Sequence, residues 1–149
     1  MIDGFKFATA TSGTALSITG LSSSVEFKNI NFGVCASSHI NVAAGATCFA
    51  TGNYTISGGA SWHYGSFSNG LITVAGLTIT LTGTPAFSVA FCVAQTTGIV
   101  VANANSYSGS ATGVRYNIIL NAVVNTAGGG ANYFPGNSAG TTATGGQYV

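Results

Sequence analysis

Hydrophobic and polar residues alternate with a period of two in several short stretches of the chain, which is the pattern of a β-strand with one buried face. The clearest stretch is residues 77–82, in which three threonines fall on one face. Residues 25–32 and 54–57 show shorter alternation, and residues 115–124 form a longer strand-like run. Glycine-containing turns such as Asn69-Gly70 separate these runs. The pattern predicts many short strands joined by tight turns.

Helix-forming residues are scarce throughout the chain. Glu occurs once, and Lys and Gln occur twice each, although all three are good helix formers. Thr, Val, Ile, Tyr and Phe, which favour strands, are abundant. The chain is therefore expected to be all-β. Many short strands with regular turn signals can form a sandwich, a barrel or a solenoid.

Two weak internal repeats discriminate between these architectures. Residues 70–74 can be laid over residues 98–102, an offset of 28, and residues 52–57 over residues 76–80, an offset of about 24. Such offsets fall within the range of about 20–50 residues expected for the coils of a solenoid. The sequence therefore predicts a single-stranded parallel β-helix of about six coils, each stacked on the next at about 4.8 Å. A β-sandwich is the alternative.

The last part of the chain has a different composition. Residues 1–126 carry the repeat-like strands, whereas residues 127–149 are rich in glycine and lack strong alternation. Tyr133, Phe134 and Tyr148 are large side chains that a free tail does not need. We expect an extended segment that caps the solenoid and packs on its body or on a neighbouring subunit, with these three residues as candidate oligomer contacts.

Charged side chains are unusually rare. They make up 3% of the chain, against about 25% in ordinary globular domains. Nucleic-acid binding needs several Lys and Arg side chains to contact the phosphates. The chain has three basic residues, which is too few for this role. No apolar run approaches the ~20 residues of a membrane-spanning helix. A net charge of +1 promotes association, so we expect a chain that is built into an assembly, without nucleic-acid binding or membrane insertion.

Several stretches near the C terminus resemble a known group of proteins. Residues 107–116, 121–126, 133–136 and 145–148 resemble the C-terminal end of right-handed parallel β-helix proteins of phages and prophages, which are tail fibres, tailspikes or related virion components. The resemblance lies mainly in the C-terminal two thirds of the chain. It implies a right-handed solenoid, a homotrimer, contacts with other virion proteins and a location on the exterior of the phage particle.

The resemblance also implies a structural or adhesive role, as a fibre, spike or decoration protein that touches bacterial surface polysaccharide during host attachment. A polysaccharide depolymerase or lyase with a site formed between subunits is one alternative, and a capsid-cementing protein is another. Glycosidases use paired carboxylates, but Asp3 and Glu26 are the only acidic residues. The sequence does not group the residues that a lyase could use, which are Lys28, His39, His63 and Arg115. We therefore expect no enzymatic activity, no catalytic residues and no cofactor.

Two features are candidate contacts for a glycan or for another subunit. Trp62, His63 and Tyr64 form the densest aromatic cluster, and Trp and Tyr faces suit both sugar stacking and interfaces. A packed turn is the alternative interpretation of this cluster. Arg115 is the only charged side chain from residue 66 to residue 149. It could contact a ligand or glycan, or it could form a structural ion pair or clamp backbone carbonyl groups at the C-terminal cap.

The chain has three cysteines, Cys35, Cys48 and Cys92, and no Cys-x-x-Cys motif, which argues against a zinc site. A buried free cysteine packs as a small hydrophobic residue, and this is one interpretation. The odd number also allows a disulfide to a second chain. His39 has no further ligand at a spacing suited to zinc, so no metal site is predicted.

Overall fold

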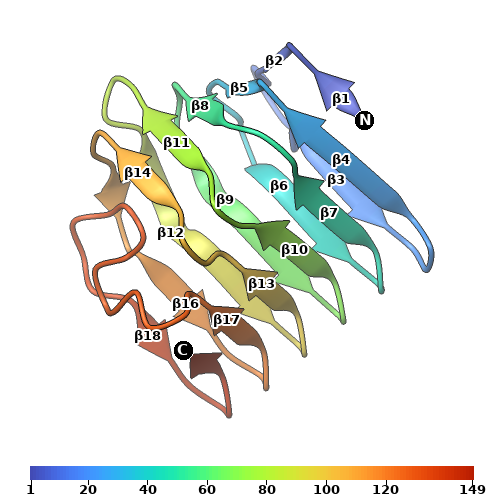
Figure 1. Ribbon diagram of the computed structural model, residues 1–149, viewed down its shortest axis with the longest axis vertical. Helices are drawn as coiled ribbons and strands as arrows, with labels where there is room; N and C mark the ends of the chain where they lie inside the picture. Colours follow the sequence, from blue (N-terminus) through green and yellow to red (C-terminus); the bar gives the residue numbers. More distant parts are fainter.

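The computed structural model describes residues 1–149 and is an all-β parallel β-solenoid of about six coils without a helix (Figure 1). Nineteen strands pair in parallel and stack into three sheets that run along the length of the molecule. This confirms the predicted fold class and rules out the β-sandwich. The structure offers no helix of the length and apolar character needed to cross a membrane.

Most coils contribute one strand to each sheet. Sheet A contains β1 (Ile2–Asp3), β4 (Ser24–Lys28), β7 (Thr47–Ala50), β10 (Leu71–Val74), β13 (Ile99–Val101), β17 (Val123–Asn125) and β19 (Gln147–Tyr148). Sheet B contains β14 (Ser106–Ser108), β11 (Thr78–Leu81), β8 (Tyr54–Ile56), β5 (Asn31–Phe32) and β2 (Lys6–Phe7). Sheet C contains β18 (Thr141–Thr142), β16 (Tyr116–Ile118), β12 (Ala86–Gln95), β9 (Ala60–Phe67), β6 (Ser38–Ala43) and β3 (Leu16–Thr19), with β15 (Thr112–Gly113) also paired to β12.

The chain passes from sheet C to sheet A through a tight turn that recurs along the solenoid. Two consecutive residues have positive φ at Ala44-Gly45, Ser68-Asn69, Thr96-Thr97, Leu120-Asn121 and Thr144-Gly145, as in a type I′ turn. These turns recur every 24 residues, except that 28 residues separate Ser68 from Thr96. The longer coil holds the irregular pairing of β12 on β9, between Phe87 and Ala90. The offset of 28 read from the sequence is thus the length of one coil. The offset of about 24 is close to the length of the others, but it lies one residue out of register, because Tyr54 on β8 pairs with Ile79 on β11.

Inward-facing side chains lie in register from one coil to the next. In sheet A, four fully buried residues stand beside one another on successive strands: Cys48, Ile72, Val100 and Val124. Stacking in this way lets each coil cover the apolar face of its neighbour, which removes that surface from water. The hydrophobic effect is therefore spread evenly along the molecule rather than gathered in one centre.

Aromatic rings form a second column through the interior. The column runs from β2, the first sheet-B strand of the chain, to the loop at residues 126–140. It passes through Phe7, Phe32, His63, Phe91 and Phe134, with successive ring centroids 6.3, 5.2, 5.1 and 5.8 Å apart. Such separations suit stacked and edge-to-face aromatic pairs. The column ties the first coil to the last and includes one histidine that composition alone would place on a surface.

Residues 127–149 continue the solenoid. β18 pairs with β16 and β19 pairs with β17, so the segment adds a strand to sheet C and a strand to sheet A. The loop at residues 126–140, which precedes β18, folds back on the preceding coil, where the Gly113 N–H donates to Asn137 Oδ1 at 2.9 Å. Phe134 is fully buried in the core of its own chain, and the Tyr148 ring stacks on Tyr116 at 4.0 Å. Phe134 and Tyr148 therefore pack against residues of their own chain.

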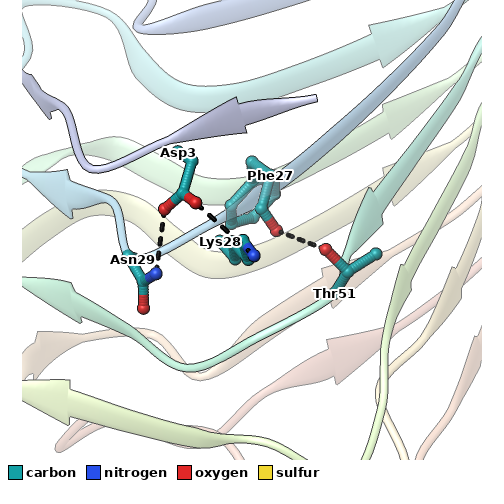
Figure 2. A network of polar contacts seen from close by, with 5 residues as sticks. All are labelled: Asp3, Phe27, Lys28, Asn29 and Thr51. Carbon is teal, nitrogen blue, oxygen red and sulfur yellow. Dashed lines mark hydrogen bonds and ion pairs between the residues drawn. The ribbon is translucent and has the colours of Figure 1, made fainter.

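The chain's ion pair joins the first two coils on the outside of the solenoid (Figure 2). Lys28 Nζ lies 3.4 Å from Asp3 Oδ2, and Asn29 Nδ2 donates to Asp3 Oδ1 at 2.8 Å. The hydrogen bond from Asn29, helped by the nearby Lys28 ammonium, lowers the pKa of the Asp3 carboxyl. An exposed pair of this kind adds little stability, so packing of the coils, not charge, holds the solenoid together.

Candidate functional site

Trp62, His63 and Tyr64 on β9 do not form one surface. His63 and Tyr64 are 0% exposed and lie in the interior. The Trp62 indole lies outside, edge-to-face with Phe67 at 5.6 Å, and covers Gly65, where a Cβ would come within 2.1 Å of its Nε1. A glycan or a second subunit cannot reach His63 or Tyr64 in the folded chain, which corrects the expectation for these two residues and leaves only Trp62 of the three as a surface candidate.

The buried polar rings form one continuous chain of hydrogen bonds. His39 Nε2 lies 2.9 Å from the Gly33 carbonyl oxygen, and His39 Nδ1 lies 2.9 Å from His63 Nδ1. His63 Nε2 lies 3.0 Å from the Tyr54 hydroxyl, which in turn contacts the Tyr64 hydroxyl. Four side chains from two neighbouring coils are thus linked in the interior.

The donor and acceptor of each hydrogen bond in this series follow from its first member, the Gly33 carbonyl oxygen. A carbonyl oxygen only accepts, so His39 Nε2–H donates to Gly33 and His39 Nδ1 carries a lone pair. His63 Nδ1–H must then donate to His39, and the free lone pair of His63 Nε2 accepts from the Tyr54 hydroxyl. Tyr54 has used its proton, so Tyr64 donates to Tyr54. The geometry therefore assigns opposite neutral tautomers to His39 and His63.

Burial supports this neutral assignment. Desolvation lowers the pKa of His39 to about 4 and also lowers that of His63, where the nearby His39 adds to the effect. No carboxylate lies in the interior, because Asp3 and Glu26 are both exposed. At neutral pH the four side chains of this series are uncharged and the nitrogen atoms of both imidazoles are hydrogen bonded, so the series contributes to stability.

The three cysteines are free and buried. Burial raises the pKa of the Cys48 thiol to about 12 and also raises that of Cys92 and Cys35. A protonated, buried thiol is a poor nucleophile. None of the three is accessible for the disulfide to a second chain that the odd number of cysteines allowed, because all three are buried in the folded solenoid. No three His, Cys, Asp or Glu side chains are grouped as ligands of a metal ion.

Arg115 lies in a hollow of the surface near the C-terminal end of the solenoid. The hollow measures about 240 Å³ and is lined by Tyr107, Gly109, Ser110, Ala111, Arg115, Asn132, Tyr133, Phe134, Pro135 and Gly136. We call it the Arg115 pocket. Its lining comes from the end of β14, the segments that flank β15 and the loop at residues 126–140, which the chain brings together only on folding.

The Arg115 side chain has no partner inside the chain. Its backbone N–H donates to the Ser138 carbonyl at 3.1 Å and its carbonyl accepts from Cys92 at 3.1 Å. Its guanidinium makes no hydrogen bond and no ion pair, and the side chain is half-buried. The carbonyl clamp that the sequence left open is therefore absent, and the five N–H donors of the guanidinium are free for a ligand.

A second hollow of about 310 Å³ lies over sheet B. It is lined by Asn29, Ile30, Asn31, Asn53, Tyr54, Thr55, Thr78 and Thr80, and none of these is charged. Its three amide side chains already have partners within the chain: Asn29 binds Asp3, Asn53 accepts from the Thr78 N–H, and Asn31 accepts from Ser57. The Arg115 pocket offers more unsatisfied donors and is the stronger candidate site.

Comparison of the chain with family models, with curated proteins and with solved structures found no match.

Proposed function

We propose that this chain is a structural and adhesive component on the exterior of a phage particle, which contacts a bacterial surface glycan through the Arg115 pocket. The resemblance to phage and prophage β-helix proteins supports a location on a phage particle. The solenoid fold supports a mechanical role as a stiff element. Backbone hydrogen bonds run between coils along the whole molecule, and such an element carries force without a flexible joint. The nearly uncharged, hydroxyl-rich exterior suits contact with sugars.

The observation that carries the adhesive part of this proposal is the free guanidinium of Arg115 beside the ring of Tyr133. The stretches 107–116 and 133–136, which carry the resemblance, both contribute to the lining of the pocket. Sugar-binding sites need an aromatic face for the C–H groups of the ring and polar groups for its hydroxyls. The lining of the pocket includes the aromatic residue Tyr133 and the polar residues Arg115, Ser110 and Asn132.

We expect the intact chain to bind at least one polysaccharide from a panel of bacterial surface polysaccharides. Chemical-shift mapping by NMR should then place the largest changes at Ser110, Arg115, Asn132 and Tyr133. A panel without any binder, or shift changes confined to another face, would contradict the proposed function.

The proposal also includes self-association into a homotrimer through the outer face of sheet A. Parallel sheets are usually covered on both faces, but this face carries an apolar group on adjacent strands, Phe49, Leu71, Ile99, Val101 and Val123, all partly or fully exposed. None of the five is charged, so the group suits a like surface of a second copy better than a charged partner.

The intact chain is expected to have the solution mass of a trimer by light scattering, and Ile99→Asp should shift it to the monomer. Placing a carboxylate at the centre of an apolar contact carries a large desolvation penalty. Val89→Asp is the matched control, because Val89 on sheet C is 42% exposed against 41% for Ile99. Circular dichroism would establish that both variants fold. A monomeric parent chain, or equal effects of the two variants, would argue against association through sheet A.

A further inference from the structure

We propose that the Arg115 pocket selects an acidic sugar residue, one that carries a carboxylate, over its neutral counterpart. This inference rests on the proposed glycan contact and specifies the chemistry of that contact. It is argued from the charge distribution, from the size of the pocket and from the rigidity of its walls.

The charge distribution leaves Arg115 without an internal counter-ion. The two acidic side chains, Asp3 and Glu26, lie on β1 and β4, at the opposite end of the solenoid from β16 (Figure 1). Lys28, by contrast, has the Asp3 carboxylate 3.4 Å away. A half-buried cation gains from a partner more than an exposed one does, because less water screens the interaction. The partner of Arg115 must therefore come from outside the chain.

The chemistry of the guanidinium indicates which anion fits. Its planar arrangement of N–H donors matches the two oxygens of a carboxylate, so that two parallel hydrogen bonds can form. The neighbouring Ser110 hydroxyl and Asn132 amide can serve the hydroxyl groups of a sugar. A simple carboxylate would bind the guanidinium but would leave the Ser110 hydroxyl and the Asn132 amide without a partner. An acidic sugar can bind the guanidinium through its carboxylate and these two groups through its hydroxyls.

The dimensions of the pocket suit one sugar ring. Drug-sized ligands occupy pockets of about 300–1,000 Å³, and the Arg115 pocket, at about 240 Å³, is smaller. The Tyr133 ring forms part of its wall and stands edge-to-face with Tyr107 at 5.6 Å. The Tyr133 hydroxyl accepts from the Asn105 N–H at 2.8 Å, which holds the ring in place as a platform.

The loop beside Arg115 is held in place by backbone contacts. Gly136 has φ +150°, and a Cβ there would lie 2.8 Å from the Gly113 carbonyl oxygen and 3.1 Å from Arg115 Cγ. Asn137 and Ser138 both donate their N–H groups to Gly113, at 3.1 Å each. The glycine permits this close approach, and the hydrogen bonds maintain it. A preorganised site loses less entropy when its ligand binds.

The test uses the intact chain and a matched pair of probes. One is an oligosaccharide that contains glucuronic acid, and the other is the same oligosaccharide with its carboxyl group reduced to a primary alcohol. Calorimetry or NMR titration should give at least tenfold tighter binding of the acidic form. Arg115→Gln should abolish that preference, and Arg115→Lys should retain only part of it, because an ammonium cannot form the paired hydrogen bonds. Lys28→Gln is the control and should leave both affinities unchanged.

The outcomes separate this inference from the proposed function. Equal affinities for the two probes, or a preference that survives Arg115→Gln, would overturn the selection of acidic sugars while glycan binding stands. Failure of both probes together with binding of a neutral polysaccharide at the pocket would overturn the inference in the same way. A third probe, the oligosaccharide phosphorylated in place of the carboxylate, shows whether the site prefers a carboxylate, and tighter binding of that probe would contradict the proposal.

Discussion

Replacement of His63 by alanine is expected to lower the free energy of unfolding by roughly 3–5 kcal/mol. The substitution removes a fully buried ring from the aromatic column and leaves a cavity. It also removes the acceptor of the Tyr54 hydroxyl and the partner of His39 Nδ1. Unpaired polar groups in a buried site are costly because they have lost water without gaining a partner. Urea denaturation followed by circular dichroism measures the change.

Two further variants separate the causes. Tyr64→Phe keeps a ring of nearly the same size and removes only the hydroxyl at the end of the chain of hydrogen bonds, so we expect a loss of about 0.5–1.5 kcal/mol. Thr55→Ala, on the outward face of sheet B, should change stability by less than about 0.5 kcal/mol. If His63→Ala were no more destabilising than Thr55→Ala, the buried polar chain would have no part in stability.

Stability of the parent chain is expected to fall steeply as the pH is lowered from about 6.5 to 4. Burial lowers the pKa of His39 from 6.5 to about 4 and lowers that of His63 as well. In this range the unfolded chain therefore binds more protons than the folded chain, and each binding event favours unfolding. The stabilisation is complete above pH 6.5 and is lost as the pH falls towards 4. For His39 alone the loss amounts to about 3 kcal/mol.

The groups around the two imidazoles explain why the loss of stability in acid is assigned to His39 and His63. His39 and His63 face each other, the Tyr54 and Tyr64 hydroxyls and the rings of Phe32, Phe87 and Phe91, and no carboxylate is present to stabilise an imidazolium. The lowered pKa of Asp3 acts mainly near and below its usual value of 3.8, so most of the loss of stability between pH 6.5 and 4 comes from the two histidines.

Urea midpoints measured at several pH values test the acid sensitivity, and ¹⁵N shifts of the imidazole rings at pH 7 test its origin. The shifts should show a proton on Nε2 of His39 and on Nδ1 of His63. Constant stability between pH 7 and 4.5, or the same tautomer for both rings, would refute this account of the interior.

Local sequence patterns predicted much of the fold. Thr78 and Thr80 face outward while Ile79 and Leu81 are buried, as alternation requires of a strand. The offset between residues 70–74 and 98–102 is the observed pairing of β10 with β13, in which Leu71 lies beside Ile99. These features could be read from the sequence because they depend on residues within one strand or on the length of one coil.

The candidate site and the buried polar chain could not be read in that way. His63 stands between Trp62 and Tyr64 in the sequence, and nothing local distinguishes the ring that faces outward from those that face inward. His63 is tolerated in the interior because His39, 24 residues away, and Tyr54, 9 residues away, satisfy its nitrogen atoms. The Arg115 pocket likewise depends on the loop at residues 126–140, which the glycine content of that segment indicated only as an extended tail.

The sequence by itself determined the all-β character, the coil lengths and the scarcity of charge, because strand alternation, turn spacing and composition are properties of neighbouring residues. Only the tertiary structure decided which polar rings are buried and what surrounds Arg115. Stacking of the coils brings together residues that are about one coil apart. This proximity supplies the buried nitrogen atoms of His39 and His63 with partners, whereas it leaves the guanidinium of Arg115 without one.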